Sequence, residues 1–162
     1  MKKTITLLML TISFCMNAQW SNYNNNNNWA AVEGYNTIGG ANNLVGGYGN
    51  TATASGSLVA GYSNTNTSGN YSLVVGQENT ATGINSAAMG RNTTASGNYS
   101  TAMGRNTTAS GIYATAMGES TTASADYSTA MGSYTTASGT YSIGMGYRTT
   151  ASDFASVVIG QY

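Results

Sequence analysis

The 162-residue sequence contains no histidine and no proline, and it has a single cysteine, Cys15. Only 6% of its residues are charged. Without histidine, the chain lacks the one side chain whose ordinary pKa suits acid–base work near neutral pH and which commonly binds metals. Without a second cysteine, it forms neither an internal disulfide nor a thiolate metal site. These absences argue against an enzyme and against a metalloprotein.

The few charges are spread out. Beyond Lys2 and Lys3, three arginines stand against five carboxylates, a net charge of −2, and this argues against nucleic acid, whose binding needs clustered positive charge. Acid–base catalysis needs paired titratable groups in one pocket, and a calcium-binding repeat needs a recurring aspartate. The acidic residues instead fall in different parts of the chain: Glu33, Glu78, Glu119, Asp126 and Asp153. The sequence therefore predicts no catalytic residue, no cofactor-binding residue and no metal ligand.

The N-terminus has the pattern of a secretory signal peptide. Lys2 and Lys3 precede an apolar run from Ile5 to Phe14, and Met16-Asn17-Ala18 follows, which predicts cleavage after Ala18. The run is too short to span a bilayer, which takes about 20 residues. A lipid anchor on Cys15 is disfavoured by the bulky Phe14 before it. Cleavage after Ala18 removes the only cysteine.

A glycine recurs every fourteen residues in the second half of the chain. The series is Gly76, Gly90, Gly104, Gly118, Gly132, Gly146 and Gly160, and we interpret its members as structural turn glycines, because glycine readily adopts positive φ. A fixed period indicates stacked repeats. The repeat is looser before Gly83, and the step from Gly61 to Gly76 is fifteen residues. We expect the extra residue to form a bulge or a longer turn near residues 64–66.

Each period divides into two short strands. In Tyr99–Gly104, alternate residues share a face, so that Ser100 and Ala102 lie opposite the others; in Asn106–Gly111, Thr107 and Ala109 share a face. Two strands of about five residues and two turns complete one coil. Coils stacked about 4.8 Å apart would give eight or nine rungs between residues 38 and 162. Because Gly and Thr are poor helix formers, the sequence predicts an all-β parallel β-roll, or solenoid.

Stacking places equivalent residues in columns. A methionine column is a candidate core or trimer-contact column, a threonine column is a candidate surface column, and a tyrosine column is interpreted chiefly as structural packing. One methionine and two alanines per rung bury little apolar surface, so we expect the methionine or tyrosine column to form a second core between chains. The columns are Met89, Met103, Met117, Met131 and Met145; Thr94, Thr108, Thr122, Thr136 and Thr150; and Tyr71, Tyr99, Tyr113, Tyr127 and Tyr141.

The recurring Ser-x-Ala-x-Gly and Ala-Ser-Gly units resemble the head repeat of trimeric autotransporter adhesins, the YadA-like head. The resemblance covers about residues 41–160, with units such as Ser100–Gly104, Ser128–Gly132 and Ala109–Gly111. It implies a left-handed parallel β-roll, a homotrimer, display on a bacterial surface or outer membrane, and a role in virulence. Family members carry a neck, a stalk and a membrane anchor after the head. Nothing in this sequence resembles them, so membrane attachment would need an anchor outside this chain.

The predicted organisation is a signal peptide at 1–18, an Asn-rich leader at 19–36 and head repeats at 37–162. We interpret Asn24–Asn28 as a polar linker, and we expect Trp29 to cover the first rung. The predicted function is that of a secreted or surface adhesin head, which binds an extracellular protein or glycan, or other bacteria. Two alternatives stay open: an ice-binding β-solenoid, because threonine columns lie on flat rungs, and a passive spacer or fibre segment.

Overall fold

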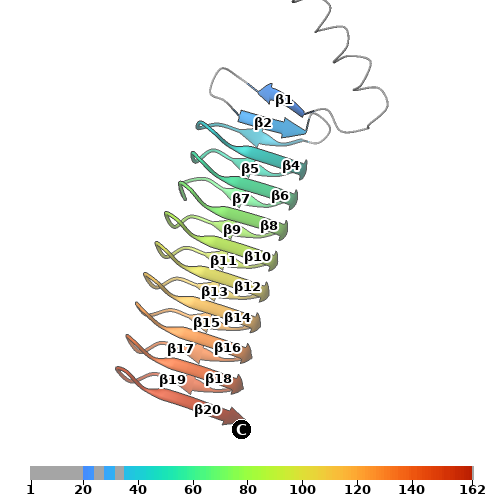
Figure 1. The fold of residues 1–162 in the computed structure, drawn as a ribbon. Helices are drawn as coiled ribbons and strands as arrows, with labels where there is room; N and C mark the ends of the chain where they lie inside the picture. The colour runs from blue at the N-terminus through green and yellow to red at the C-terminus, as the bar shows by residue number, and fades with distance from the viewer. Residues whose placement is uncertain (1–19, 24–27, 32–34, 162) are drawn as a thin grey trace, which may run out of the picture.

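The computed structural model describes residues 20–23, 28–31 and 35–161. The predicted signal peptide and Cys15 lie outside these residues. The described residues form two β-sheets that face each other along a rod (Figure 1). These residues contain no helix. Consequently, no helix that could cross a membrane occurs in this part of the chain. The prediction of an all-β parallel solenoid is confirmed.

Each rung contributes one strand to each sheet. After the N-terminal strands, those of the long sheet have five residues: β4 (Leu44–Tyr48), β6 (Leu58–Tyr62), β8 (Leu73–Gln77), β10 (Ala87–Arg91), β12 (Thr101–Arg105), β14 (Thr115–Glu119), β16 (Thr129–Ser133), β18 (Ile143–Tyr147) and β20 (Val157–Gln161). Those of the short sheet have two: β3 (Thr37–Ile38), β5 (Thr51–Ala52), β7 (Thr65–Asn66), β9 (Thr80–Ala81), β11 (Thr94–Ala95), β13 (Thr108–Ala109), β15 (Thr122–Ala123), β17 (Thr136–Ala137) and β19 (Thr150–Ala151). The expected length of about five residues is thus right for one strand of each coil only.

Neighbouring rungs pair in parallel and in register. Met103 pairs with Met89 and Met117, and Gly104 pairs with Gly90 and Gly118. The short sheet has nine strands, so the stack has about nine rungs, as predicted. Equivalent residues therefore form the columns that the fourteen-residue period predicts.

The interior of the roll is thin, and most of the side chains in it are small. Alternate residues point inward, so that Ala102 and Ala109 are fully buried in one rung, together with Ser100 and Thr107. The largest fully buried apolar side chains are valines, and they lie in the first rungs: Val45, Val59 and Val74. The methionine column is not part of this interior. Its members are half-buried on the outer face of the long sheet.

The glycine column lies inside the long strands rather than at their ends. Gly104 is the fourth residue of β12, and its φ is +122°. A Cβ atom at this position would lie 2.0 Å from the carbonyl oxygen of Gly118 in the next rung. The close approach of two backbones therefore requires glycine here, in addition to the positive φ.

The extra residue of the fifteen-residue step lies just after residues 64–66 rather than within them. Thr65 pairs with Thr80, and Leu58 pairs with Leu73, so the insertion falls between β7 and β8, at residues 67–72. Asn66 occupies an alanine column and donates from Nδ2 to the Gly69 carbonyl at 2.9 Å, across the longer turn. The prediction of a longer turn holds, and its position is corrected.

Part of the predicted leader continues the long sheet. β1 (Trp20–Tyr23) pairs antiparallel with β2 (Asn28–Ala31), and β2 pairs in parallel with β4, with Trp29 opposite Leu44. The two strands lie over the first rung in Figure 1. Asn28 is therefore in a strand rather than in a linker, and residues 24–27 lie outside the described part.

Candidate binding surfaces

The roll offers four surfaces. Two are the outer faces of the sheets, which we call the long-sheet face and the short-sheet face. The chain turns between the sheets along two edges. The tyrosine edge carries the turns that lead from a short strand to the next long strand, such as 96–100. The variable edge carries the last residue of each long strand and the turn that follows it, such as 105–107.

The long-sheet face is largely apolar. It carries the half-buried methionine column and, two residues earlier in each strand, a second column that is Leu, Ile or Val at both ends of the stack and Ala or Thr in between. Leu44 and Leu58 are about two-fifths exposed, at 42% and 38%. Among the described residues, no further layer of structure covers this face.

The short-sheet face carries rows of hydroxyl groups. The candidate surface column lies here: Thr108 and Thr122 are half-buried, and Thr150 is exposed. Two residues later in each rung, a serine such as Ser110 or Ser124 is exposed. Each of these rungs thus presents two hydroxyl groups to solvent.

The tyrosine edge is a stack of rings. The centroids of Tyr99, Tyr113, Tyr127 and Tyr141 are 4.8, 5.1 and 4.8 Å apart, and successive rings are within 14° of parallel. Phe154 then meets Tyr141 edge-on at 5.7 Å. Because each ring covers the face of the next, the inner faces are occupied by the stack itself. This geometry supports the structural interpretation of the tyrosine column.

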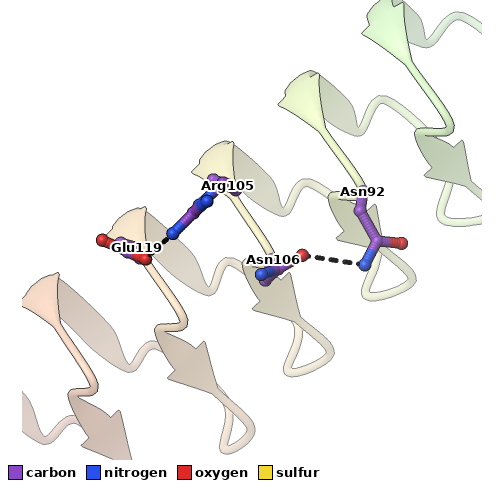
Figure 2. Close-up of polar contacts among 4 residues, drawn as sticks. All are labelled: Asn92, Arg105, Asn106 and Glu119. Carbon is purple, nitrogen blue, oxygen red and sulfur yellow. Dashed lines mark hydrogen bonds and ion pairs between the residues drawn. The ribbon is translucent and has the colours of Figure 1, made fainter.

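The variable edge carries contacts between rungs that differ along the stack. Figure 2 shows two of them: Asn92 Nδ2 donates to Asn106 Oδ1 at 2.9 Å, and Arg105 forms an ion pair with Glu119. The hydrogen bond from Arg105 to Glu119, together with the charge of that carboxylate, raises the pKa of Arg105. The pair is exposed to solvent, so its contribution to stability is small.

Two tyrosines and an arginine form a cluster further along the variable edge. The Arg148 guanidinium carbon lies 5.2 Å from the centroid of the Tyr147 ring and 5.9 Å from that of Tyr134. The two rings meet nearly at right angles, with centroids 6.2 Å apart. Columns of like residues do not reveal this cluster, because the two columns that hold its residues vary along the stack. That variation is the signal of the cluster in the sequence.

A buried column of asparagines and threonines was also missed. Asn79 is fully buried; its Nδ2 donates to the Val75 carbonyl at 3.0 Å and to the Gly90 carbonyl of the next rung at 2.8 Å. Its Oδ1 accepts from the amide and the hydroxyl of Thr93. The column binds rungs together and has no access to a ligand. In residues 35–160, no three His, Cys, Asp or Glu side chains group together as metal ligands would.

Comparison with protein-family models matches the YadA head domain repeat at residues 81–107, 109–135 and 137–162. The chain belongs to the family of YadA head repeats. Comparison with curated proteins gave no match. Heads of this family are parts of bacterial surface adhesins without enzymatic activity, and they form trimers in general. Rungs 37–80 lie outside the matched segments, but they share the same parallel pairing, so the YadA-like head architecture extends over them.

Proposed function

We propose that this chain is the head of a secreted or cell-surface adhesin, which assembles as a homotrimer and binds an extracellular protein, a glycan or other bacteria without catalysis. The match to YadA head repeats, within a stack of about nine unbroken rungs, carries the proposal. The hydroxyl rows of the short-sheet face suit an ice-binding solenoid, but the family match favours the adhesin.

The long-sheet face is the proposed contact between the three copies. Inside a single roll, the apolar side chains that are fully buried are valines and alanines, and these contribute little hydrophobic stabilisation for the backbone that they order. The methionines could contribute about 1.5–3 kcal/mol each if they were fully buried. Methionine also fills irregular gaps, which suits a contact between curved strands. A second core between copies would supply the burial that one roll lacks.

Replacing Met117 with aspartate is expected to dissociate the trimer. Met117 lies mid-column, between Met103 and Met131, and a carboxylate there would be buried in each of three copies without a partner. Sedimentation equilibrium should then report single chains or aggregates. The matched control is Ser124→Asp on the exposed short-sheet face, which should leave the mass unchanged. An unchanged mass for M117D would place the contact elsewhere.

The adhesin function is tested by binding. The purified chain should bind saturably to at least one surface in a panel of immobilised extracellular matrix proteins, host cells and bacterial cells. Binding should survive heat treatment that inactivates ordinary enzymes but leaves the trimer intact. A folded trimer that binds nothing in the panel would overturn the proposal in favour of a passive spacer.

A further inference from the structure

Residues on the variable edge differ from rung to rung more than the stacking of the rungs requires. Interior columns repeat almost without change, because each side chain must fit the same space in every rung. On the variable edge, two successive positions differ from rung to rung. The first position reads Tyr48, Tyr62, Gln77, Arg91, Arg105, Glu119, Ser133 and Tyr147; the second reads Gly49, Ser63, Glu78, Asn92, Asn106, Ser120, Tyr134 and Arg148.

The second position places unusual residues in an unusual backbone conformation. Its members have positive φ, which Asn and Ser tolerate better than bulkier residues do. Tyr134 and Arg148 nevertheless occupy it, with φ values of +56° and +53°. The five tyrosines of the tyrosine edge have the same conformation, with φ between +58° and +60°, so positive φ alone does not set Tyr134 apart. What sets Tyr134 and Arg148 apart is their column, in which the other rungs carry Gly, Ser, Glu or Asn.

Charge is also divided between the edges. All three arginines of the described chain stand on the variable edge, together with Glu78 and Glu119, whereas the charged residues of the tyrosine edge are Asp126 and Asp153. Glu119 pairs with Arg105, and no carboxylate in residues 35–160 forms an ion pair with Arg148. The Arg148 guanidinium instead lies against the two exposed tyrosines, Tyr134 at 52% and Tyr147 at 37%.

We propose that Arg148, Tyr134 and Tyr147 bind a carboxylate-bearing sugar residue of an acidic glycan. The proposal deepens the proposed adhesin function and rests on it. The planar guanidinium matches a carboxylate with two parallel N–H···O bonds, and the rings hold it in place from one side by cation–π attraction. The tyrosines offer apolar ring surface to the sugar C–H groups and hydroxyls to its oxygens.

The other aromatic edge does not offer this chemistry. Its inner ring faces are covered by the neighbouring rings, and the charged groups beside it, Asp126 and Asp153, would repel a carboxylate. Aromatic residues alone therefore do not define the site. Neither Arg91 nor Arg148 forms an ion pair within residues 35–160, and of the two only Arg148 lies against aromatic rings, so the combination of an unpaired cation with two rings distinguishes the site.

The test compares two substitutions that each remove one arginine and insert a residue already present in the same column. Arg148→Asn copies Asn92 and Asn106, and Arg91→Gln copies Gln77. Polygalacturonate is the probe, and its fully methyl-esterified form, which has the same backbone without the charge, is the control ligand. Titration calorimetry or surface binding reports affinity, and sedimentation confirms that each variant keeps the parent's mass.

The chain should bind polygalacturonate and bind the methyl ester at least tenfold more weakly. R148N should lose about tenfold to a hundredfold in affinity, the usual cost of removing a charged hydrogen-bond partner, while R91Q should change affinity less than threefold. Equal losses in R148N and R91Q, equal binding of the ester, or no binding of polygalacturonate would overturn the site. If the chain adheres to cells or matrix proteins while R148N adheres equally well, the adhesin function stands and this site falls.

Discussion

Gly104→Ala is expected to destabilise the roll by about 4 kcal/mol or more, which is exceptional for the addition of one methyl group. The new Cβ atom would lie 2.0 Å from the Gly118 carbonyl oxygen, which belongs to backbone and cannot rotate away. The φ of +122° adds strain for any L residue. The two rungs would have to separate, and their ladder hydrogen bonds would break. Urea unfolding followed by circular dichroism measures the loss.

The same substitution at Gly144 is the matched control. Gly144 lies in the same sheet, but in the inward column that carries Ala130 in the rung before and Val158 in the rung after. Its nearest atom to an added Cβ is a threonine methyl group at 3.0 Å, and its φ is not positive. We expect G144A to stay within about 1 kcal/mol of the parent. Equal effects of G104A and G144A would contradict the assigned role of the glycine column.

Asn79→Ala is expected to cost about 3–5 kcal/mol, because it leaves several buried backbone groups without partners at about 1–3 kcal/mol each. The side chain binds the carbonyls of Val75 and Gly90 and the amide of Thr93, so its loss affects two rungs at once. Thermal and urea unfolding measure the change. Hydrogen exchange should show the lost protection first at the amide of Thr93.

Asn79→Thr separates these hydrogen bonds from simple filling of the space. Threonine occupies this column from Thr93 onward, and Thr135 Oγ1 donates to the Gly146 carbonyl of the next rung at 3.1 Å. The hydroxyl groups of Thr107 and Thr121 in the same column have no hydrogen-bond partner among the described residues. A threonine at position 79 should therefore keep at most the bond to Gly90 and lose the bond to Val75, at a cost of about 1–2 kcal/mol. If N79T were as damaging as N79A, neither the volume of the side chain nor the bond to the Gly90 carbonyl would hold the column, and the hydrogen bonds that threonine cannot make would carry the whole effect.

A second inward column changes its residue type at the rung where this column changes from asparagine to threonine. Val74 gives way to Ala88 in one inward column, at the same step at which Asn79 gives way to Thr93 in another. The change from valine to alanine reduces side-chain volume, and the change from asparagine to threonine removes a side-chain amide, so the rungs after Gly83 enclose smaller apolar side chains than the rungs before it. This matches the change in the sequence from a loose repeat to an exact one.

The sequence predicted the fold well, because a fourteen-residue period with alternating faces leaves few arrangements. Alternation placed Ala102 and Met103 on opposite faces, but it left open whether the methionine column is a core column or a contact between chains; the structure shows that Ala102 is buried inside the roll and that Met103 is half-buried on the outer face. It misplaced the insertion, because a count of residues between Gly61 and Gly76 gives the length of a step but not which turn takes up the extra residue. Only the pairing of Thr65 with Thr80 locates it.

The candidate site was harder to predict for a different reason. Repeats are found in a sequence because equivalent residues are alike, whereas a binding site on a repeat protein lies where equivalent residues differ. Tyr134, Tyr147 and Arg148 come from two rungs and meet only when the chain is coiled. Likewise, the partners of Asn79 lie 4, 11 and 14 residues away, on both neighbouring strands, and the sequence alone does not pair them.

The central claim is that the roll is a protomer of a trimeric adhesin head whose second core lies on the long-sheet face. Sedimentation equilibrium of the purified parent chain, at micromolar concentration and with circular dichroism to confirm β-structure, tests it most directly. We expect a mass of three chains that does not change on dilution. A folded species with the mass of one chain would contradict it.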